Sequence, residues 1–216
     1  MIRVYSVTIA VALAVTLLLF AQRRAPETSP ERFRGVVDLT APIPADAAQQ
    51  MMATRLEAPA LYIPGAWSVD QIPPERLIGS LIVLDVRQKA QHDPQYRVSP
   101  ADISDFERAH GLIPPGSIVV ARTGGAHDQH AAFPAFSYDA VQFLTEGRNT
   151  LALGTDSAAI AGDASTLRYA GQHQLYGLTG IRDLDRAPQA GAILIVAPPR
   201  ALSATQADAR ILALLR

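Results

Sequence analysis

The sequence predicts an α/β fold, in which helices pack against a sheet of buried strands. Three apolar runs, at residues 77–86, 117–123 and 192–198, have the length and apolar density of buried strands. Two segments between these runs carry the residues that start helices. The 216 residues, of which 49% are hydrophobic and 18% charged, suffice for one globular domain with a hydrophobic core.

The strands are expected in a regular order along the chain. Residues 36–40 (VVDLT) predict the first strand, and residues 77–86 (LIGSLIVLDV) predict a strand that is buried along its length. Further strands are expected at 117–123, 151–157, 192–198 and 208–214.

Two helices have clear start and stop residues. Ser99 is a favoured N-cap and Pro100 suits the first helical position, so a helix is expected from there to His110, with Gly111 as its C-terminal cap. Ser137 predicts the cap of a second helix, which Gly147 is expected to end.

Charge and cysteine content exclude several classes of function. The formal net charge is -1, which gives no electrostatic reason to expect nucleic acid as a partner. The absence of cysteine excludes disulfides, thiolate nucleophiles and cysteine-based zinc sites.

The N-terminus predicts a three-part organisation. Residues 1–22 form a signal peptide or a membrane anchor, because the apolar run falls between the length of a secretory core and that of a membrane span. Residues 23–35 form a tether, and residues 36–216 the domain. The arginines after the run favour a cytoplasmic domain if the helix is retained. A short N-terminal run before a globular domain favours export, so we expect an exported or membrane-anchored protein on the extracytoplasmic side.

Residues 51–65 (MMATRLEAPALYIPG) resemble the signature segment of the cyclase family, which includes bacterial kynurenine formamidases and isatin hydrolases. The family segment reads His-x-Gly-Thr-His-x-Asp-x-Pro-x-His-Phe. Thr54 and Pro59 match it, and the run from Pro115 to Gly124 is similar to a second family stretch. The resemblance extends from about Val37 to Leu214. It implies a mixed, partly barrel-like sheet with packed helices, a homo-oligomer, and metal-dependent hydrolysis of aryl formamides or cyclic amides.

The metal ligands that the resemblance implies are replaced in this chain. Met51 and Arg55 stand at the positions of the two metal-binding histidines, Glu57 at the aspartate and Leu61 at the later histidine. In the second half of the chain, the remaining histidine and glutamate positions are expected to correspond to Ala164 and Tyr176. We therefore predict that no metal or other cofactor is bound.

The residues of this segment predict what takes the place of the cation. On an extended segment, residues 51, 55 and 57 point to one side. Arginine is always protonated and has no lone pair to donate to a metal. The sequence therefore predicts an internal ion pair between Arg55 and Glu57. The alternative is an ordinary surface strand.

Several other side chains are expected near the pocket, each with a structural alternative. Trp67 is a lid or the anchor of its loop. His127, Asp128 and His130, in the loop from 124 to 136, form a metal-capable or acid-base cluster or a solvated loop. Asp156 is a pocket carboxylate or bonds its own turn. Tyr176 offers its hydroxyl to Glu57 or Arg55, or is a core residue. The full prediction is Arg55, Glu57 and His127 as catalytic residues and, as ligand-binding residues, Met51, Thr54, Leu61, Tyr62, Trp67, His130, Asp156 and Tyr176.

Three functions are compatible with these residues. The first is a cyclase-family homologue that has lost metal-dependent hydrolysis and binds a small aromatic or cyclic amide ligand. The second is an active hydrolase with an altered site, in which Arg55 stabilises an oxyanion and Glu57 or His127 acts as the base. The third is a structural role at a membrane, through the N-terminal segment.

Overall fold

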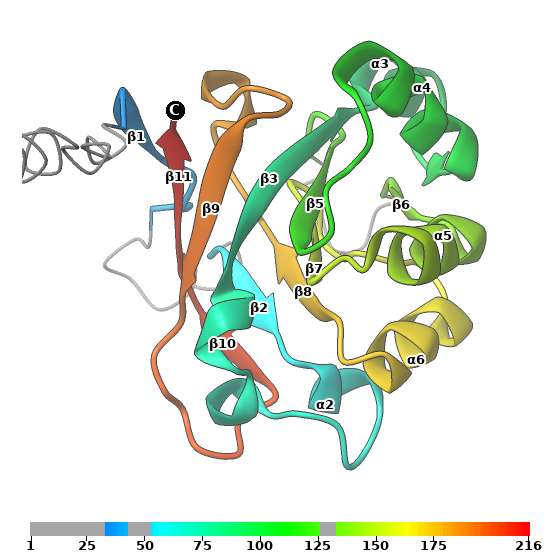
Figure 1. Cartoon of the computed structure of the whole chain (residues 1–216). Helices are drawn as coiled ribbons and strands as arrows, with labels where there is room; N and C mark the ends of the chain where they lie inside the picture. The colour runs from blue at the N-terminus through cyan, green and yellow to red at the C-terminus, as the bar shows by residue number, and fades with distance from the viewer. Residues whose placement is uncertain (1–32, 43–52, 126–132) are drawn as a thin grey trace, which may run out of the picture. The chain divides into compact units, whose positions relative to one another are not determined.

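The computed structural model describes residues 33–42, 53–125 and 133–216, and residues from Phe33 onward form one unit. Within this part, nine strands form one sheet in the order β1-β11-β9-β3-β5-β7-β8-β2-β10 (Figure 1). Their bounds are β1 (Gly35–Asp38), β2 (Arg55–Glu57), β3 (Ile78–Asp85), β5 (Ser117–Arg122), β7 (Ala152–Thr155), β8 (Tyr176–Thr179), β9 (Ala192–Ala197), β10 (Gln206–Asp208) and β11 (Arg210–Leu215). A second sheet pairs β4 (Arg97–Val98) with β6 (Ala135–Phe136).

The large sheet is mixed and curls into a half-barrel. β3, β5, β7 and β8 run parallel to one another, whereas the other neighbouring pairs are antiparallel. β1, near the start of the described chain, pairs with β11 at its end. The prediction of an α/β fold with a partly barrel-like mixed sheet is therefore confirmed.

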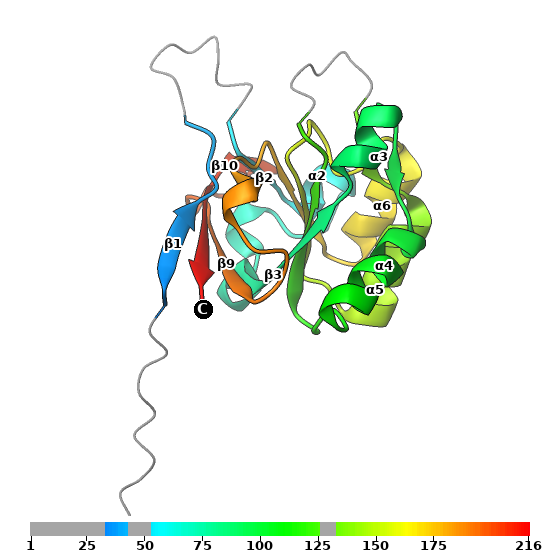
Figure 2. The same ribbon diagram turned by 90° about the horizontal axis from the view of Figure 1, so that it is seen from above.

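Helices cover one part of one face of this sheet. The described helices are α2 (Pro59–Tyr62), α3 (Arg87–His92), α4 (Pro100–His110), α5 (Tyr138–Arg148) and α6 (Ala164–Gln172), with short 3-10 turns at η2 (Val69–Gln71), η3 (Pro74–Leu77) and η4 (Leu184–Arg186). Figure 2 shows α4, α5 and α6 stacked on the same side, away from β1 and β9. None of the helices in the described residues is long and apolar enough to cross a membrane.

Alternation of side chains along the strands divides the interior into two cores. On the inner side of the curl, one core includes Leu56, Val120 and Leu178. On the helix side, a second core includes Val119 and Leu153. Successive strand residues point to opposite faces, so neighbours such as Val119 and Val120 belong to different cores.

The first predicted helix is confirmed at both ends. The Ser99 side chain and the Asp102 carboxylate form a reciprocal capping box, and Gly111 is the C-cap with a φ of 88°. The second helix also begins as predicted, because the Ser137 hydroxyl accepts from the Ala140 N–H at 3.2 Å. The predicted stop at Gly147 is wrong. The helix continues to Arg148 and ends at Asn149, which adopts the left-handed conformation that asparagine tolerates.

α6 was not expected, and it is the element that fixes the position of α2. Asp163 caps α6 by accepting from the Thr166 N–H at 2.8 Å. Gly171 then lets α2 approach closely, since a Cβ at this position would lie 2.7 Å from Ile63 Cγ2 and 3.2 Å from the Pro59 carbonyl oxygen. α2 carries Tyr62, so this contact helps to position a side chain of the candidate site.

Candidate functional site

β2 holds Arg55 and Glu57 on the helix side of the sheet. The strand lies between β8 and β10, with Arg55 opposite Thr179 and Glu57 opposite Gly177. Leu56, between them, is fully buried in the inner core. The extended conformation that the sequence predicted is thus present, and it points both charged side chains to the same face. Met51, the third residue predicted on this face, lies outside the described residues.

Tyr62 reaches back from α2 to Glu57. Its hydroxyl donates a hydrogen bond of 2.7 Å to Glu57 Oε2. Gly177 provides the necessary space, because a Cβ there would lie 2.3 Å from the Tyr62 hydroxyl and 3.3 Å from Glu57 Oε2. Glycine inside a strand often marks such a close approach, and this signal in the sequence was missed.

Burial is the largest influence on the pKa values of both Glu57 and Tyr62. Desolvation raises the pKa of Glu57, although the Tyr62 hydrogen bond and the positive charge of Arg55 act in the opposite direction. Burial also raises the pKa of Tyr62 well above its usual value, and the adjacent Glu57 carboxylate adds to the shift. Tyr62 therefore remains a hydrogen-bond donor throughout the physiological pH range.

Arg55 has an acidic neighbour that the sequence analysis did not identify. Its Nε lies 3.6 Å from Asp208 Oδ1, across the β2–β10 pairing, and the two side chains are 33% and 46% exposed. Glu57 interacts with Arg55 electrostatically, whereas its hydrogen bond comes from Tyr62. Arg55 therefore has Asp208 as an acidic neighbour in addition to the predicted Glu57.

The ends of the parallel strands bring further polar groups to the same edge of the sheet. Thr155 lies at the end of β7 and Thr179 at the end of β8, and both are buried. Ser157 follows β7, and its buried hydroxyl finds no hydrogen-bond partner among the residues that the structure describes. The carboxyl ends of parallel strands are where α/β sheets commonly bind ligands. Arg55 belongs to this edge, because it pairs with Thr179.

Asp156 organises the loop after β5 rather than its own turn. Its carboxylate accepts from the Thr123 N–H at 2.9 Å, the Thr123 hydroxyl at 2.7 Å and the Gly124 N–H at 3.0 Å. The alternative that Asp156 bonds its own turn is therefore not the arrangement observed. Its carboxylate joins the ends of β7 and β5, which stabilises the edge of the site.

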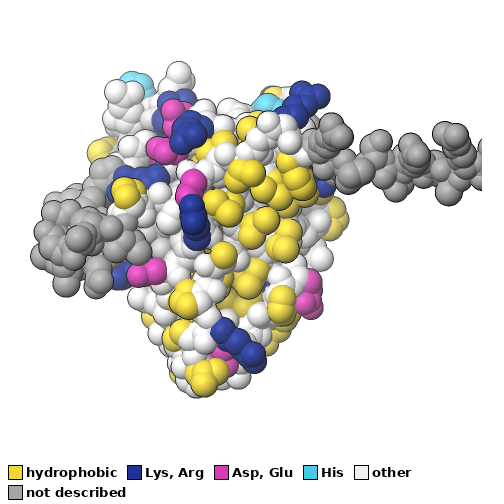
Figure 3. Space-filling view, turned by 90° about the vertical axis from the view of Figure 1, so that its left-hand side faces the viewer, with side chains coloured by type: hydrophobic (Ala, Val, Ile, Leu, Met, Phe, Trp, Pro, Cys, Tyr) yellow, Lys and Arg dark blue, Asp and Glu magenta, His cyan; other side chains and the backbone are white. Residues whose placement is uncertain are grey.

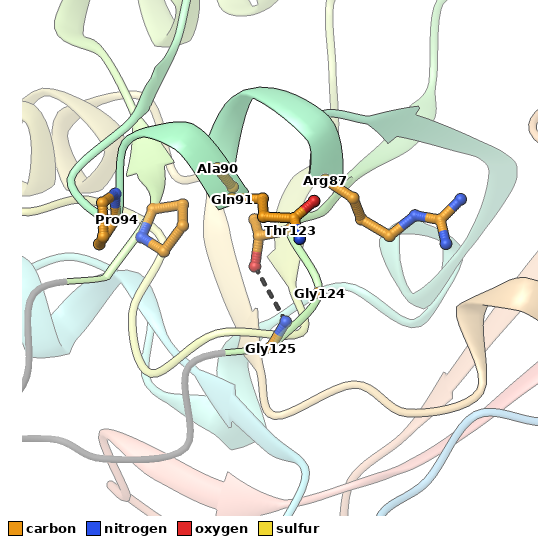
Figure 4. Close-up of a pocket in the computed structure, with 8 residues that line it drawn as sticks. Arg87, Ala90, Gln91, Pro94, Thr123, Gly124 and Gly125 are labelled. Atoms are coloured by element: carbon orange, nitrogen blue, oxygen red, sulfur yellow. Dashed lines mark hydrogen bonds between the residues drawn. The ribbon is translucent and has the colours of Figure 1, made fainter.

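A pocket of about 430 Å³ opens beside this loop (Figure 4). In the close-up, the Gly125 N–H donates to the Thr123 hydroxyl at 3.3 Å, and the Arg87 side chain extends away from Gln91. The Arg87 guanidinium forms an ion pair with Asp85, in which its Nη2 lies 2.7 Å from Asp85 Oδ2. The described lining consists of Arg87, Ala90, Gln91, Pro94, Thr123, Gly124, Gly125 and Pro134. The predicted site residues His127 and His130, with Asp128, lie outside the described residues.

Two of the predicted ligand-binding residues, Thr54 and Tyr176, are buried and make structural contacts. Thr54 is buried, and its hydroxyl accepts from the Ala41 N–H and donates to the Gly180 carbonyl. Of the two alternatives for Tyr176, the structure matches the core residue and not the bond to Glu57 or Arg55. Its hydroxyl donates to the Arg76 carbonyl at 2.9 Å.

Trp67 lies on the other face of the sheet from Arg55, and Leu61 faces solvent. Trp67 packs against the inner core, with the Arg76 guanidinium 5.4 Å from its ring. The backbone N–H of Trp67 donates to Gln174 Oε1 at 3.0 Å, two residues before β8, so its contacts match the loop-anchor alternative rather than the lid. Leu61 is 38% exposed.

The described part of the site does not offer the ligands that a divalent cation requires. Zinc and manganese favour imidazole and carboxylate, whereas β2 supplies one guanidinium and one carboxylate that already accepts from Tyr62. Ala164 starts α6 and has no donor side chain. Across residues 33–42, 53–125 and 133–216, no three His, Cys, Asp or Glu side chains gather to hold an ion. The absence of a metal stays a prediction, since Met51, His127 and His130 lie outside the described residues.

Comparison with known proteins identifies the family. Residues 37–161 match the Cyclase family model. The chain belongs to the cyclase family. It is similar to the isatin hydrolase of Roseibium aggregatum, with 30% identity over 188 residues that cover 75% of this chain and 70% of that protein.

Solved structures of cyclase-family proteins share the fold. Isatin hydrolase A from Labrenzia aggregata, bound to benzyl benzoate, superposes with a TM-score of 0.74 at 23% identity, over 84% of this chain and 93% of that one. An isatin hydrolase bound to the product analogue thioisatinate gives a TM-score of 0.67 at 21% identity, over 89% and 86% of the two chains. At these identities the likeness establishes the fold alone.

Proposed function

We propose that this cyclase-family chain binds a small aromatic or cyclic amide ligand at the Arg55 edge of the sheet, and that it does so without a catalytic metal ion. The observation that carries the proposal is the position of Arg55. The Arg55 guanidinium is partly exposed, and its Nε lies 3.6 Å from Asp208 Oδ1. Arg55 lies on β2 opposite Thr179, at the edge of the sheet where β7 and β8 end. The ligands named for the solved relatives, benzyl benzoate and thioisatinate, support an aromatic ligand.

The chemistry of Arg55 indicates which ligand groups the site would favour. A guanidinium presents five N–H donors in a plane and cannot be deprotonated, so it suits a carbonyl or carboxylate oxygen. Glu57, with its raised pKa, contributes less negative charge than an ordinary carboxylate as the pH falls. We therefore expect ligands that carry an oxygen acceptor beside an aromatic ring.

A second candidate function is hydrolysis through an altered site. The raised pKa of Glu57 supports it, because a general base works best with a pKa near the working pH. In this alternative Glu57 takes a proton from the water that attacks the amide carbonyl, and returns it to the nitrogen as the carbon–nitrogen bond breaks. Arg55 stabilises the oxyanion that forms on the carbonyl oxygen, and Tyr62 positions Glu57.

Binding and metal content can be measured on the same preparation. The full chain, purified in detergent, would be titrated calorimetrically with isatin and with thioisatinate, in chelator and without it. We expect unchanged affinity in chelator. Arg55→Ala should weaken binding about 10-fold to 100-fold, the loss expected for a hydrogen bond to a charged group. Arg186→Ala is the control, since Arg186 is exposed and pairs with Asp183.

Hydrolysis distinguishes the two functions. Isatin turnover would be followed with added Mn²⁺, added Zn²⁺ or chelator, together with the metal content of the protein. No turnover under any condition supports binding, and turnover in chelator that Glu57→Gln abolishes supports the altered hydrolase. Stoichiometric metal together with turnover that chelator removes would refute both.

We also propose that residues 1–22 direct the domain out of the cytoplasm. The support is the apolar run at residues 4–21, which lies outside the described residues. Fractionation of cells that produce the tagged chain, with the mass of the recovered protein, tests the proposal. A full-length protein found in the soluble cytoplasmic fraction would contradict it.

A further inference from the structure

One half of the sheet carries an apolar surface over which the described residues place no second layer. Side chains that alternate with the inner core point outward from β1, β11, β9 and the first half of β3. Strand register aligns them in two rows, Val36 with Leu214 and Ile193, and Leu212 with Ile195 and Ile78. We call these six residues the outer apolar face. Val36 is 56% exposed and Ile78 52%, and the other four are partly exposed.

The described helices leave this surface uncovered. α4, α5 and α6 pack over the second core, which contains Ile82, Val119 and Leu153. Figure 3, which faces the side of the unit with β1, β11 and β9, shows apolar side chains gathered there and charged groups mainly toward the edges. A sheet normally buries its apolar side against a further layer. The outer apolar face therefore indicates an interaction surface.

The chain enters this surface from the direction of its apolar N-terminal run. β1, which contributes Val36, is an edge strand of the sheet and the first described strand. Phe33, just before it, is 44% exposed. Residues 22–32 separate Phe33 from the apolar run at 4–21, and a segment of this length reaches at most about 40 Å. A run that stays in a bilayer therefore keeps β1 close to the lipid surface, at an effective concentration of about the millimolar range.

The charges around the outer apolar face favour an anionic lipid surface. Asp38 and Arg210 point outward from β1 and β11, and they neutralise each other in an ion pair at 2.9 Å. At the other end of β1, Arg34 directly precedes the strand and is exposed. Residues 23–34 together contain four arginines and two glutamates, an excess of positive charge. Basic residues beside an apolar surface are the combination that binds the interface of an anionic membrane.

We propose that the outer apolar face lies on the surface of the membrane that holds residues 4–21, with its six side chains at the level where lipid headgroups meet acyl chains. The inference rests on retention of residues 1–22 as an anchor. It is independent of the side of the membrane on which the domain lies and of the ligand at the Arg55 edge. In this arrangement α4, α5 and α6, on the other side of the sheet, face the aqueous phase.

Fluorescence from single labelled cysteines tests the proposal, because the natural chain has no cysteine. Ile195→Cys and Leu212→Cys would be made singly in the full chain, labelled with an environment-sensitive dye and inserted into nanodiscs that contain phosphatidylglycerol. Tyr138→Cys is the control, since Tyr138 is 40% exposed and starts α5 on the helix side. Interfacial apolar groups lie about 5–10 Å inside the headgroup boundary, so doxyl-labelled lipid should quench the face labels at least about threefold more than the control label.

A charged substitution provides the second arm. Ile193→Glu in the Ile195→Cys background should reduce quenching to the level of the Tyr138→Cys control. Its melting temperature shows that the fold is retained, since Ile193 points away from the inner core. Replacing phosphatidylglycerol with phosphatidylcholine should also reduce the quenching of the face labels.

Three results would overturn the proposal. The first is equal quenching of the face and control labels. The second is a face label that is shielded from water but not quenched by doxyl lipid, as expected where protein rather than lipid covers the face. The third is a full chain, of intact mass, that does not copurify with the nanodiscs. None of these results bears on ligand binding at the Arg55 edge, which the calorimetric titration measures separately.

Discussion

The Tyr62 hydroxyl donates a hydrogen bond of 2.7 Å to Glu57 Oε2, in space that the absence of a side chain at Gly177 leaves open. The bond joins a four-residue helix to a three-residue strand, neither of which is long enough to be rigid alone. The protonation of Glu57 therefore depends on where α2 holds the Tyr62 hydroxyl.

Removing the hydroxyl should change the protonation of Glu57. Tyr62→Phe eliminates a donor that stabilises the carboxylate, so the already raised pKa of Glu57 should rise further. Carbon NMR of labelled glutamate side chains measures the titration. Tyr169→Phe is the control, because it removes an equivalent bond to Glu146 at the surface. A Glu57 titration that is the same in Tyr62→Phe and in the natural chain would contradict the expected coupling.

The pH dependence of stability should contain a contribution from Glu57. Its folded pKa lies above the unfolded value, so the folded state binds more protons between the two. The free energy of unfolding should therefore fall as the pH rises through this window. Glu57→Gln cannot titrate and should flatten this part of the profile, as measured by urea unfolding at a series of pH values. A steeper fall in the Gln variant would refute the assignment.

Filling the space at Gly177 should destabilise the protein. Gly177→Ala places a Cβ 2.3 Å from the Tyr62 hydroxyl, and overpacking of this kind costs about 1–3 kcal/mol. Combining it with Tyr62→Phe should recover part of the loss, because the clashing atom is gone. Gly147→Ala is the matched control. It meets nothing within 4 Å and lies in α5, so it should stabilise the protein by about 0.5–1 kcal/mol. Additive unfolding energies for Gly177→Ala and Tyr62→Phe would exclude the contact.

Asp156 should control opening of the loop after β5. In Asp156→Ala, the Thr123 and Gly124 amides lose a charged acceptor and should exchange hydrogen about 10-fold to 100-fold faster. Amide exchange resolved by residue measures this directly. Asp93→Ala removes an exposed carboxylate that accepts from the Gln95 N–H, and it should leave both rates unchanged. Unaltered exchange at Thr123 in Asp156→Ala would show that other contacts hold the loop.

Local sequence signals predicted the elements whose ends carry specific cap residues. The helix from Pro100 to His110 was predicted together with both of its caps, because Ser99, Pro100 and Gly111 each favour one position. α5 was predicted two residues too short, since Gly147 was taken as its end while Asn149 provides the left-handed cap. α6 has an Asp163 cap that was not recognised, so the helix was missed.

The sequence was less informative about which residues a given side chain contacts in the folded protein. For Tyr176 the sequence left two alternatives, a bond to Glu57 or Arg55 and a core position, and Glu57 in fact lies opposite Gly177. Adjacent strand residues face opposite sides, so an offset of one residue puts Tyr176 in the inner core. Asp208 was not identified as a neighbour of Arg55, because 153 positions separate them in the chain and only the β2–β10 register brings them together. Such non-local pairing is not readable from spacing.

The placement of β2 also constrains when the site can form. β2 pairs with β8 and with β10, and β1 pairs with β11, so strands from the first third of the chain depend on strands from its last fifth. A nascent polypeptide cannot complete these pairings until residues 206–215 have left the ribosome. The Arg55 edge should therefore be among the last parts to assemble during synthesis, and a chain truncated before residue 206 should lack it even if the β3–β5–β7 layer has folded.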